Sequence, residues 1–241
     1  MKDGPKYKRI LLKLSGEQLR GSQPWGINAD EIKSICRQVA KVQANGVQLA
    51  LVVGGGNIIR GSDSADLGIT RASADYMGML ATMINSLALQ DGLEQFGLET
   101  RMLSSVKAEE ICEPYIRRRA IRHLEKGRVI ILAGGTGIPF FTTDTTAAVR
   151  AMDVEADVLM KATKVDGVYS EDPAHNADAV RYDQLSFEDA MRLNVQVMDQ
   201  TAITHCRDHT LPILVFKLAA PDSIVRAANG EPIGTWIGSP P

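Results

Sequence analysis

The sequence predicts an α/β protein, a three-layer αβα sandwich with a central, mostly parallel sheet. Short apolar runs alternate along the chain with segments whose apolar residues recur at helical spacing, a pattern typical of parallel sheets covered on both faces. Glycines follow many of these segments, where helices end and loops turn. No low-complexity linker and no repeat with a period of roughly 20 to 50 residues divides the chain. We therefore expect one domain over residues 1–241, built on one continuous sheet.

The first half of the chain begins with a strand prediction at residues 8–14, a dense Ile/Leu run. A helix follows, capped by Asn28 or Asp30 and ended by Gly46, because apolar residues recur there at helical spacing, namely Ile32, Ile35, Val39 and Val42. Residues 47–53 have the pattern of a fully buried strand. A long helical pattern covers about residues 70–96, and residues 99–103 form the next strand candidate.

The second half continues the alternation. We predict a basic helix at residues 116–126, a strand at 128–133, a helix at about 143–155 and a strand at 157–161. The pattern loosens into a loop or hairpin over residues 164–179. Short helices are then expected near Ser186 and Asp199, a strand at 212–217, a helix after Pro221 and a last strand at 234–237.

Composition excludes several classes of protein. The chain is 44% hydrophobic and 23% charged, as an ordinary globular protein is. Its net charge of −2 and pI near 6.1 give no global positive field toward nucleic acid or an anionic membrane. The longest apolar stretches, 47–53 and 129–133, are far shorter than the roughly 20 residues that span a bilayer. The N-terminus lacks a signal-peptide pattern, so we expect a cytoplasmic protein without a membrane segment.

Cysteine and histidine usage indicates neither a disulfide framework nor a metal site. Cys36, Cys112 and Cys206 are odd in number and widely spaced, so we interpret them as buried small hydrophobic residues. His205 and His209 are four residues apart, as helical metal ligands can be, but no carboxylate motif accompanies them. We expect no metal ion held by protein side chains.

Three loops rich in glycine follow predicted strands, at residues 13–16, 54–57 and 134–137. If they meet at one edge of the sheet, their backbone N–H groups can surround phosphate groups, and helices starting after the second and third loops would add their positive ends. The triplet at 54–56 fits neither a dinucleotide fingerprint nor a Walker loop, since Ile59 and Ser62 stand where glycine and lysine are required. A polyphosphate is the expected ligand, with its cation supplied from elsewhere.

Two lysines at strand ends can supply that charge. Lys13 ends the first strand and Lys161 ends the strand at 157–161, so both are placed to converge on a transferring phosphoryl group. Asp144, in the first turn of a predicted helix, either stabilises the helix dipole or holds the two lysines in register.

Four segments in order resemble the motifs of the bacterial uridylate (UMP) kinases, a family within the amino acid kinase superfamily. They are Lys13-Leu-Ser-Gly16, Gly54-Gly-Gly-Asn-Ile-Ile-Arg-Gly61, Gly134-Gly-Thr-Gly-Ile-Pro-Phe-Phe-Thr-Thr-Asp144 and Lys161-Ala-Thr-Lys-Val-Asp-Gly-Val-Tyr169. The first and last are shared with acetylglutamate kinase and aspartokinase, whereas the middle two are the ones specific to UMP. The resemblance covers about residues 7–237 and implies the amino acid kinase fold, with an acceptor-binding N-terminal part and an ATP-binding C-terminal part.

The resemblance implies ATP-dependent phosphorylation of UMP to UDP, with Mg²⁺ carried by the ATP. By position it implies catalytic roles for Lys13, Asp144 and Lys161. It implies ATP binding by Lys13, Leu14, Ser15, Gly16, Gly56, Arg60, Thr163, Tyr169 and Asp172. It implies UMP binding by Gly55, Asp75, Thr136, Gly137, Ile138, Pro139, Phe140, Phe141, Thr142 and Thr143.

The resemblance also implies a homohexamer that GTP activates and UTP inhibits. The segment that would respond to GTP is Gly21, Ser22, Gln23, Pro24, Trp25 and Gly26. Two residues depart from the family pattern: Trp25 is bulkier than the residue expected there, and Ile138 replaces the more usual asparagine. The segment at 172–179 lacks a second proline.

Two other functions are alternatives. The first is a kinase of the same superfamily that phosphorylates a carboxylate substrate. The second is a nucleotide-sensing regulator that binds nucleic acid through the basic cluster of the 116–126 helix. That cluster covers more than one helical face without interleaved aromatic residues, which favours a solvated helix over a nucleic-acid site.

Overall fold

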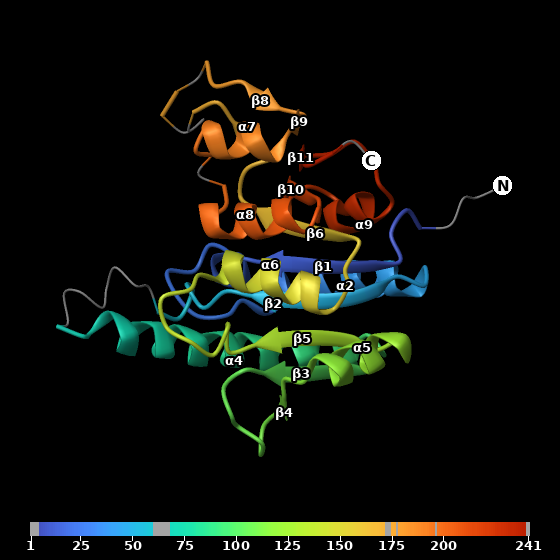
Figure 1. The fold of residues 1–241 in the computed structure, drawn as a ribbon. Helices are drawn as coiled ribbons and strands as arrows, with labels where there is room; N and C mark the ends of the chain where they lie inside the picture. Colours follow the sequence, from blue (N-terminus) through green and yellow to red (C-terminus); the bar gives the residue numbers. More distant parts are fainter. Residues whose placement is uncertain (1–4, 60–67, 172–174, 177, 196, 240–241) are drawn as a thin grey trace.

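A nine-stranded sheet forms the centre of the protein (Figure 1), in the order β4-β3-β5-β2-β1-β6-β10-β11-β9. The computed structural model describes residues 5–59, 68–171, 175–176, 178–195 and 197–239. Every neighbouring pair in this sheet is parallel except β10 and β11. The strands are β1 (Arg9–Leu14), β2 (Gln48–Val53), β3 (Thr100–Ser104), β4 (Glu113–Pro114), β5 (Val129–Ala133), β6 (Val158–Thr163), β9 (Gln184–Leu185), β10 (Ile213–Lys217) and β11 (Thr235–Ile237).

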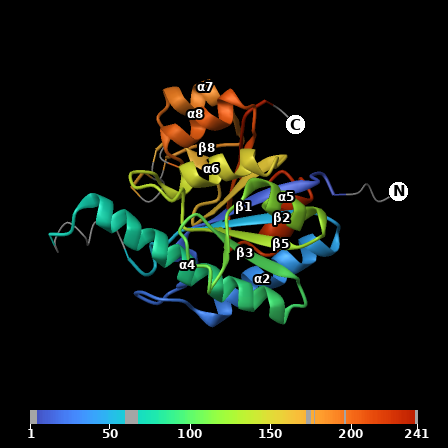
Figure 2. The same cartoon turned by 60° about the horizontal axis from the view of Figure 1, so that its bottom comes forward.

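Helices cover both faces of the sheet, and Figure 2 shows α6 and α8 on one side and α2 and α4 on the other. The helices are α1 (Gly16–Leu19), α2 (Ala29–Ala44), α4 (Arg71–Gln95), α5 (Arg117–Glu125), α6 (Thr143–Asp153), α7 (Phe187–Arg192), α8 (Gln200–Asp208) and α9 (Ser223–Ala228). The predicted α/β sandwich with a mostly parallel sheet is therefore confirmed.

Alternation along β1 assigns its side chains to two separate cores. Ile10, Leu12 and Leu14 pack with residues of α2, α4 and α9, whereas Leu11 packs with residues of α5, α6 and α8. Because side chains alternate between faces, Lys13 points to the same face as Leu11. The first catalytic candidate thus lies under α6 rather than under α2.

Polar caps fix where the main helices begin. The side chain of Asn28 accepts hydrogen bonds from the N–H groups of Asp30 and Glu31, so Asn28 rather than Asp30 caps α2. Thr70 caps α4 and Thr142 caps α6 in the same way. The cap on α6 determines the position of Asp144 in its first turn.

Several elements and placements differ from the sequence prediction. The short elements α1, β4 and β9 were not predicted. The loop or hairpin expected at 164–179 contains one strand of an antiparallel pair, β7 (Val168–Tyr169) with β8 (Arg181–Tyr182). Cys36 and Cys206 are buried as expected, but Cys112 is partly exposed, so its interpretation as a buried residue was wrong. Across the described ranges, no helix is both long and apolar enough to cross a membrane.

Candidate active site

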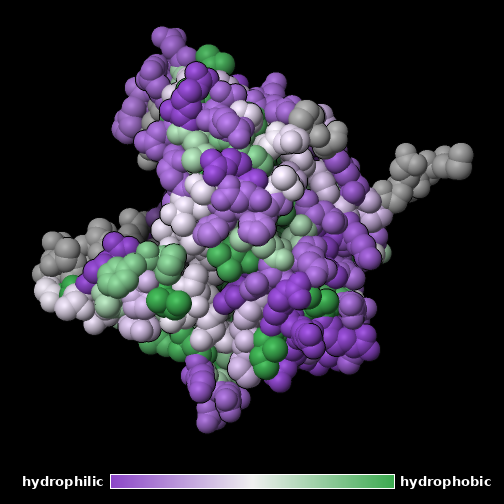
Figure 3. All heavy atoms as spheres, in the orientation of Figure 1, coloured by the Kyte–Doolittle hydropathy of each residue, from purple (hydrophilic) through white to green (hydrophobic). Residues whose placement is uncertain are grey.

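Lys13 and Lys161 lie side by side at the carboxyl ends of two neighbouring strands. They are direct partners in the parallel register of β1 and β6, and both face α6. The strands end at the hollow that Figure 3 shows between the lobe of α7 and α8 and the projecting end of α4. Ligands of open parallel sheets bind at this edge, where the carboxyl ends of strands meet.

Asp144 connects the two lysines. Its Oδ2 accepts a hydrogen bond from Lys161 Nζ at 2.6 Å, and its Oδ1 lies 3.0 Å from Lys13 Nζ. The second contact is an ion pair out of hydrogen-bond alignment, so this buried oxygen has no hydrogen-bond donor among the described residues. Lys161 also donates to the carbonyl oxygen of Val197. The three charged groups form one cluster with a net positive charge.

Burial and charge act against each other in this cluster. Burial opposes ionisation of Asp144, but the two ammonium groups outweigh it and hold the pKa of Asp144 below its ordinary value of 3.8. Burial, followed by the charge of Lys13, lowers the pKa of Lys161 below 10.5, although Asp144 and Asp199 oppose this. Asp144 is therefore ionised at neutral pH, and the proton on Lys161 is held less tightly than on a free lysine.

The first two glycine loops pack directly against each other. A Cβ atom on Gly16 would lie 2.6 Å from the carbonyl oxygen of Gly54 and 2.9 Å from the nitrogen of Gly56. One on Gly55 would lie 2.7 Å from the carbonyl oxygen of Gly78 in α4. Only glycine fits at these two positions, because each faces backbone at a distance that a Cβ atom does not tolerate.

The helix after the triplet does not point its positive end at these loops, so that expectation was wrong. α4 begins only at Arg71, and its middle turns, at Gly78 and Ala81, pack against Gly55. Among the described residues, the starts of α1 and α6 lie at the triplet instead, because a Cβ atom on Gly54 would be 3.3 Å from the nitrogen of Gly16 and 3.5 Å from the hydroxyl of Thr143. After the third loop, α6 does begin as predicted.

A buried pair of amides fixes the triplet to α4. Asn57 and Asn85 donate to each other's side-chain oxygens, at 2.9 Å and 2.7 Å, and are 2% and 0% exposed. Asn85 also donates to the carbonyl oxygen of Gly54, and Asn57 to that of Gly26. The sequence did not reveal this pair, because the partners are 28 residues apart and only Asn57 belongs to a motif.

A cavity of about 500 Å³ opens beside the triplet, between α4 and the 134–143 loop. Six of the ten residues proposed for UMP line it, namely Gly55, Asp75, Thr136, Phe141, Thr142 and Thr143. Ile138 and Phe140 do not line this cavity, and 58% and 67% of their surfaces are exposed. Asp75 is held by Arg71 at 3.0 Å and by the N–H of Phe140 at 2.8 Å, so α4 and the loop meet at this carboxylate.

The ATP candidates form two groups. Ser15, Gly16 and Gly56 lie at the packed loops, next to Lys13. Tyr169 lines a separate, largely apolar cavity of about 270 Å³ near Val165 and Val195. Thr163, at the end of β6, is tied to Val165 through hydrogen bonds of its hydroxyl. Arg60 and Asp172 lie outside the described residues, as does Gly61 of the triplet motif.

Asp199 belongs to this site although no motif indicated it. Its carboxylate accepts hydrogen bonds from the hydroxyls of Thr142 and Thr145 at the start of α6, and it caps α8 through the N–H of Ala202. The sequence placed a helix near Asp199 correctly. The contact to α6 joins residues more than 50 positions apart, so the sequence alone could not reveal it.

The segment expected to respond to GTP touches the triplet. Gly26 donates its N–H to the carbonyl oxygen of Asn57 at 2.9 Å, and Asn57 returns a hydrogen bond at 2.8 Å. Trp25 is 75% exposed. The segment therefore adjoins the triplet loop through one backbone hydrogen bond and one from the side chain of Asn57.

The basic cluster of α5 is largely neutralised. Arg117 pairs with Glu155 at 2.6 Å, and Arg119 with Glu113 at 3.4 Å. Arg122 and Arg128 also have glutamate partners. These pairs favour the solvated helix over a nucleic-acid interface.

Comparisons with known proteins agree with this geometry. Residues 8–217 match the model of the amino acid kinase family. The UMP kinase of Bacillus anthracis is 39% identical, with 98% of this chain and 97% of that chain covered and a TM-score of 0.95. The UMP kinase of Ureaplasma parvum is 34% identical, with 97% and 100% covered and a TM-score of 0.92. The uridylate kinase of Archaeoglobus fulgidus is 29% identical, with 95% and 99% covered and a TM-score of 0.75.

Proposed function

The chain belongs to the amino acid kinase family, and on that premise we propose that it phosphorylates UMP with ATP. The bond between the γ-phosphorus of ATP and the oxygen that bridges the β- and γ-phosphates breaks. A bond forms between the same phosphorus and a phosphate oxygen of UMP. UDP and ADP are the products. The likeness to UMP kinases over nearly the whole chain supports this acceptor.

Lys13 and Lys161 are proposed to neutralise the transferring group. The transition state spreads negative charge over the equatorial oxygens of the phosphoryl group, and two adjacent ammonium groups stabilise that charge. Asp144 holds both ammonium groups in position. The acceptor is already an oxygen anion, so the reaction needs no general base, and positioning supplies much of the rate enhancement.

Binding is assigned to the two sides of the packed loops. We propose that UMP occupies the cavity beside α4, with Gly55, Asp75 and the 136–143 loop around it. ATP would lie across Ser15, Gly16 and Gly56, with its base toward the apolar cavity of Tyr169. Thr163, Arg60 and Asp172 complete the proposed ATP site.

Mg²⁺ is proposed to arrive with ATP. Asp144 is occupied by two lysines, and no cluster of three or more His, Cys, Asp or Glu side chains occurs in the described part of the chain. Magnesium is commonly held by substrate phosphates together with few protein ligands. It would neutralise charge on the β- and γ-phosphates.

The observation that carries the proposal is the cluster in which the carboxylate of Asp144 pairs with both Lys13 and Lys161, directly after Thr143 of the cavity in sequence. The test is ADP release from ATP and Mg²⁺ with UMP, CMP, dUMP, acetylglutamate and aspartate as separate acceptors. We expect UMP to give the highest kcat/KM. ADP release with a carboxylate acceptor and none with UMP would overturn the proposal in favour of a carboxylate kinase.

We also base a proposal for assembly and regulation on the likeness to UMP kinases. A stripe of exposed apolar side chains on α4 supports association with further copies, in the homohexamer we propose. Its members are Tyr76, Met77, Leu80, Ile84 and Leu87. We further propose activation by GTP through residues 21–26, inhibition by UTP, and work in the cytoplasm. Repeating the ADP assay with GTP and with UTP tests both effectors.

A further inference from the structure

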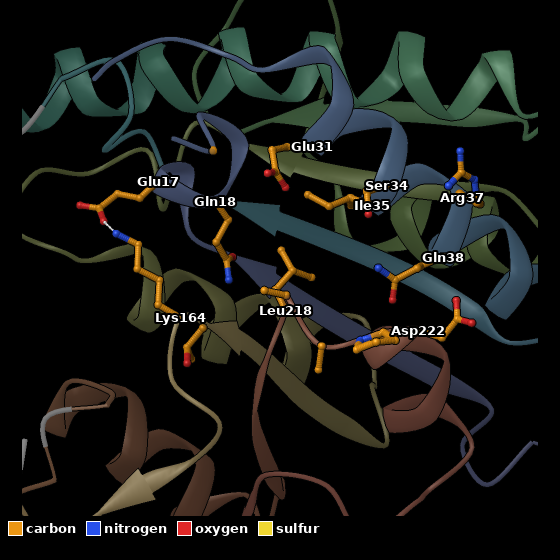
Figure 4. Close-up of a pocket in the computed structure, with 15 residues that line it drawn as sticks. Glu17, Gln18, Glu31, Ser34, Ile35, Arg37, Gln38, Lys164, Leu218 and Asp222 are labelled. Carbon is orange, nitrogen blue, oxygen red and sulfur yellow. Dashed lines mark hydrogen bonds and ion pairs between the residues drawn. The ribbon is translucent and has the colours of Figure 1, made fainter. Parts of the chain in front are cut away.

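A third cavity, of about 450 Å³, lies on the face of the sheet away from α6, and Figure 4 shows its lining residues. It is bounded by α1 and α2 on one side and by the segment between β10 and α9 on the other. It shares only Thr163 with the ATP residues proposed above, and none with the UMP cavity. No role in phosphoryl transfer accounts for it.

Gln18 presents an unused hydrogen-bond donor in this cavity. The side chain is 8% exposed, and its Oε1 accepts a hydrogen bond from the N–H of Ser15 at 2.9 Å. Its Nε2 is buried and has no partner among the described residues. Figure 4 shows this nitrogen pointing into the cavity, toward Leu218. A buried amide without a partner costs free energy, which a ligand oxygen in the cavity would recover.

Gln38 presents a second amide from α2. It is 7% exposed, and its Oε1 accepts from the N–H of Ile224 at 3.0 Å, which fixes the orientation of the amide. Figure 4 shows its nitrogen directed into the same space, toward which the Glu31 carboxylate also points. Ile35 and Leu218 supply apolar surface between these polar groups. Two donors and one acceptor therefore face one small cavity.

The charges around the cavity argue against a polyanionic ligand. Three carboxylates line it, from Glu17, Glu31 and Asp222, against the two cations Arg37 and Lys164. Lys164 is paired with Glu17 at 2.6 Å, and Asp222 is paired with Lys41 at 2.7 Å. The remaining lining charges, Glu31 and Arg37, are opposite in sign, so a phosphate group would meet no net positive charge here.

We propose that this cavity binds an uncharged ring with a cyclic imide edge, of the uracil or uridine class. Such an edge places one N–H between two carbonyl oxygens, so the oxygens can accept from Gln18 and Gln38 while the N–H donates to Glu31. Cytosine has an amino group in place of one carbonyl and no N–H between the two, so it matches only one of these three contacts.

The ligand would act on the phosphate loop through a single side chain. Gln18 touches the cavity with its nitrogen and the first phosphate loop with its oxygen, at Ser15. Fixing the amide from the cavity side would also fix Ser15 and the start of α1. Occupation of the cavity is thereby coupled to the site where ATP is proposed to bind.

The test is calorimetric titration of the full chain with uridine in the presence of saturating UMP, so that the cavity beside α4 is filled. Gln38→Glu keeps the oxygen that accepts from Ile224 and replaces the donor with an acceptor. Gln18→Glu does the same at Ser15, since glutamate suits a capping box. Gln95→Glu, at an exposed position on α4, is the matched control.

We expect uridine to bind beside UMP and to bind at least about tenfold more weakly to Gln38→Glu and to Gln18→Glu, with Gln95→Glu unchanged. Glu31→Ala, at a partly exposed position, should also weaken binding and remains informative if a buried glutamate prevents folding. Absence of uridine binding beside UMP, equal binding of cytidine, or binding unaffected by these variants would each refute the site. Heat of binding is measured without turnover, so failure of UMP phosphorylation would leave this result intact.

Discussion

Arg150 donates a hydrogen bond to the Ser105 hydroxyl at 2.8 Å, and Ser105 in turn donates to the carbonyl oxygen of Gly135 at 2.9 Å. Arg150 stacks on the ring of Tyr115 at 3.7 Å and pairs with Asp153, so its guanidinium is fixed from several sides. α6 thus holds the glycine loop that lines the cavity beside α4, through the side chains of Arg150 and Ser105.

Ser105→Ala is predicted to raise the KM for UMP about fivefold, the cost of one hydrogen bond of about 1 kcal/mol. The KM for ATP should change little, because Ser105 bonds to the loop proposed to hold UMP. Steady-state kinetics with each substrate varied in turn measures the split. An equal rise in both KM values would show that Ser105 supports the whole site rather than the acceptor loop.

Removal of any charge in the proposed catalytic cluster of Lys13, Asp144 and Lys161 should reduce turnover strongly. For Lys13→Ala, Lys161→Ala and Asp144→Ala we predict a loss in kcat of about 10²-fold or more, on the order of 3 kcal/mol, by analogy with other preorganised charge-stabilising groups. Thermal unfolding of each variant checks that the fold persists. Near-normal turnover in all three would refute the mechanism.

The lowered pKa of Lys161 predicts how the rate depends on pH. As the pH rises through that pKa, Lys161 loses its proton and its stabilising charge, so kcat should fall at a pH below 10.5. Lys161→Arg should move this fall to higher pH, because arginine stays protonated. The measurement is a kcat profile across the alkaline range for both proteins. Identical alkaline limbs would mean that another group controls the fall.

Asn85→Leu should destabilise the protein by about 1–3 kcal/mol, because it removes the donor to the buried carbonyl oxygen of Gly54 and to the side-chain oxygen of Asn57. In a chain of this length that is a fall in Tm of roughly 2–4 °C per kcal/mol. Thermal unfolding by circular dichroism measures it. Asn45→Leu, at an exposed position, is the control and should leave Tm nearly unchanged.

The apolar stripe of α4 predicts where copies of the chain meet. Leu80→Glu and Ile84→Glu place charge on side chains that are 53% and 49% exposed in the single chain. A charge buried without a partner opposes association, so the particle mass should fall. Light scattering after size-exclusion chromatography measures the mass, with Gln95→Lys as the control. An unchanged mass in both variants would place the contact elsewhere.

The sequence predicted the parts of the fold that have strong periodicity. The long pattern at 70–96 and the buried runs at 47–53 and 128–133 correspond to α4, β2 and β5. By contrast, α1 is one turn long and β4 and β9 have two residues each, too few for any period to show. Their existence depends on neighbouring strands and on the Ser15 cap.

For the site, local signals revealed the charged groups but not the contacts that hold them. Lys13 and Lys161 were visible because each ends an apolar strand, and Asp144 because it opens a helix. The links from Asp199 to Thr145 and from Asn57 to Asn85 join residues far apart in sequence. Such pairs are created by tertiary packing, and a single sequence carries no pattern for them.

The charged cluster also sets a balance between stability and function. Lys13 and Lys161 share one carboxylate in a buried place, and the folded-state pKa of Lys161 lies below its unfolded value of 10.5. At neutral pH the protonated lysine therefore costs folding free energy, and this cost lessens as the pH rises between the two values. A bound phosphate group supplies the missing negative charge. The charge of Lys161 thus lowers the stability of the unliganded protein while the lowered pKa of Asp144 raises it, and a bound phosphate group would offset the cost at Lys161.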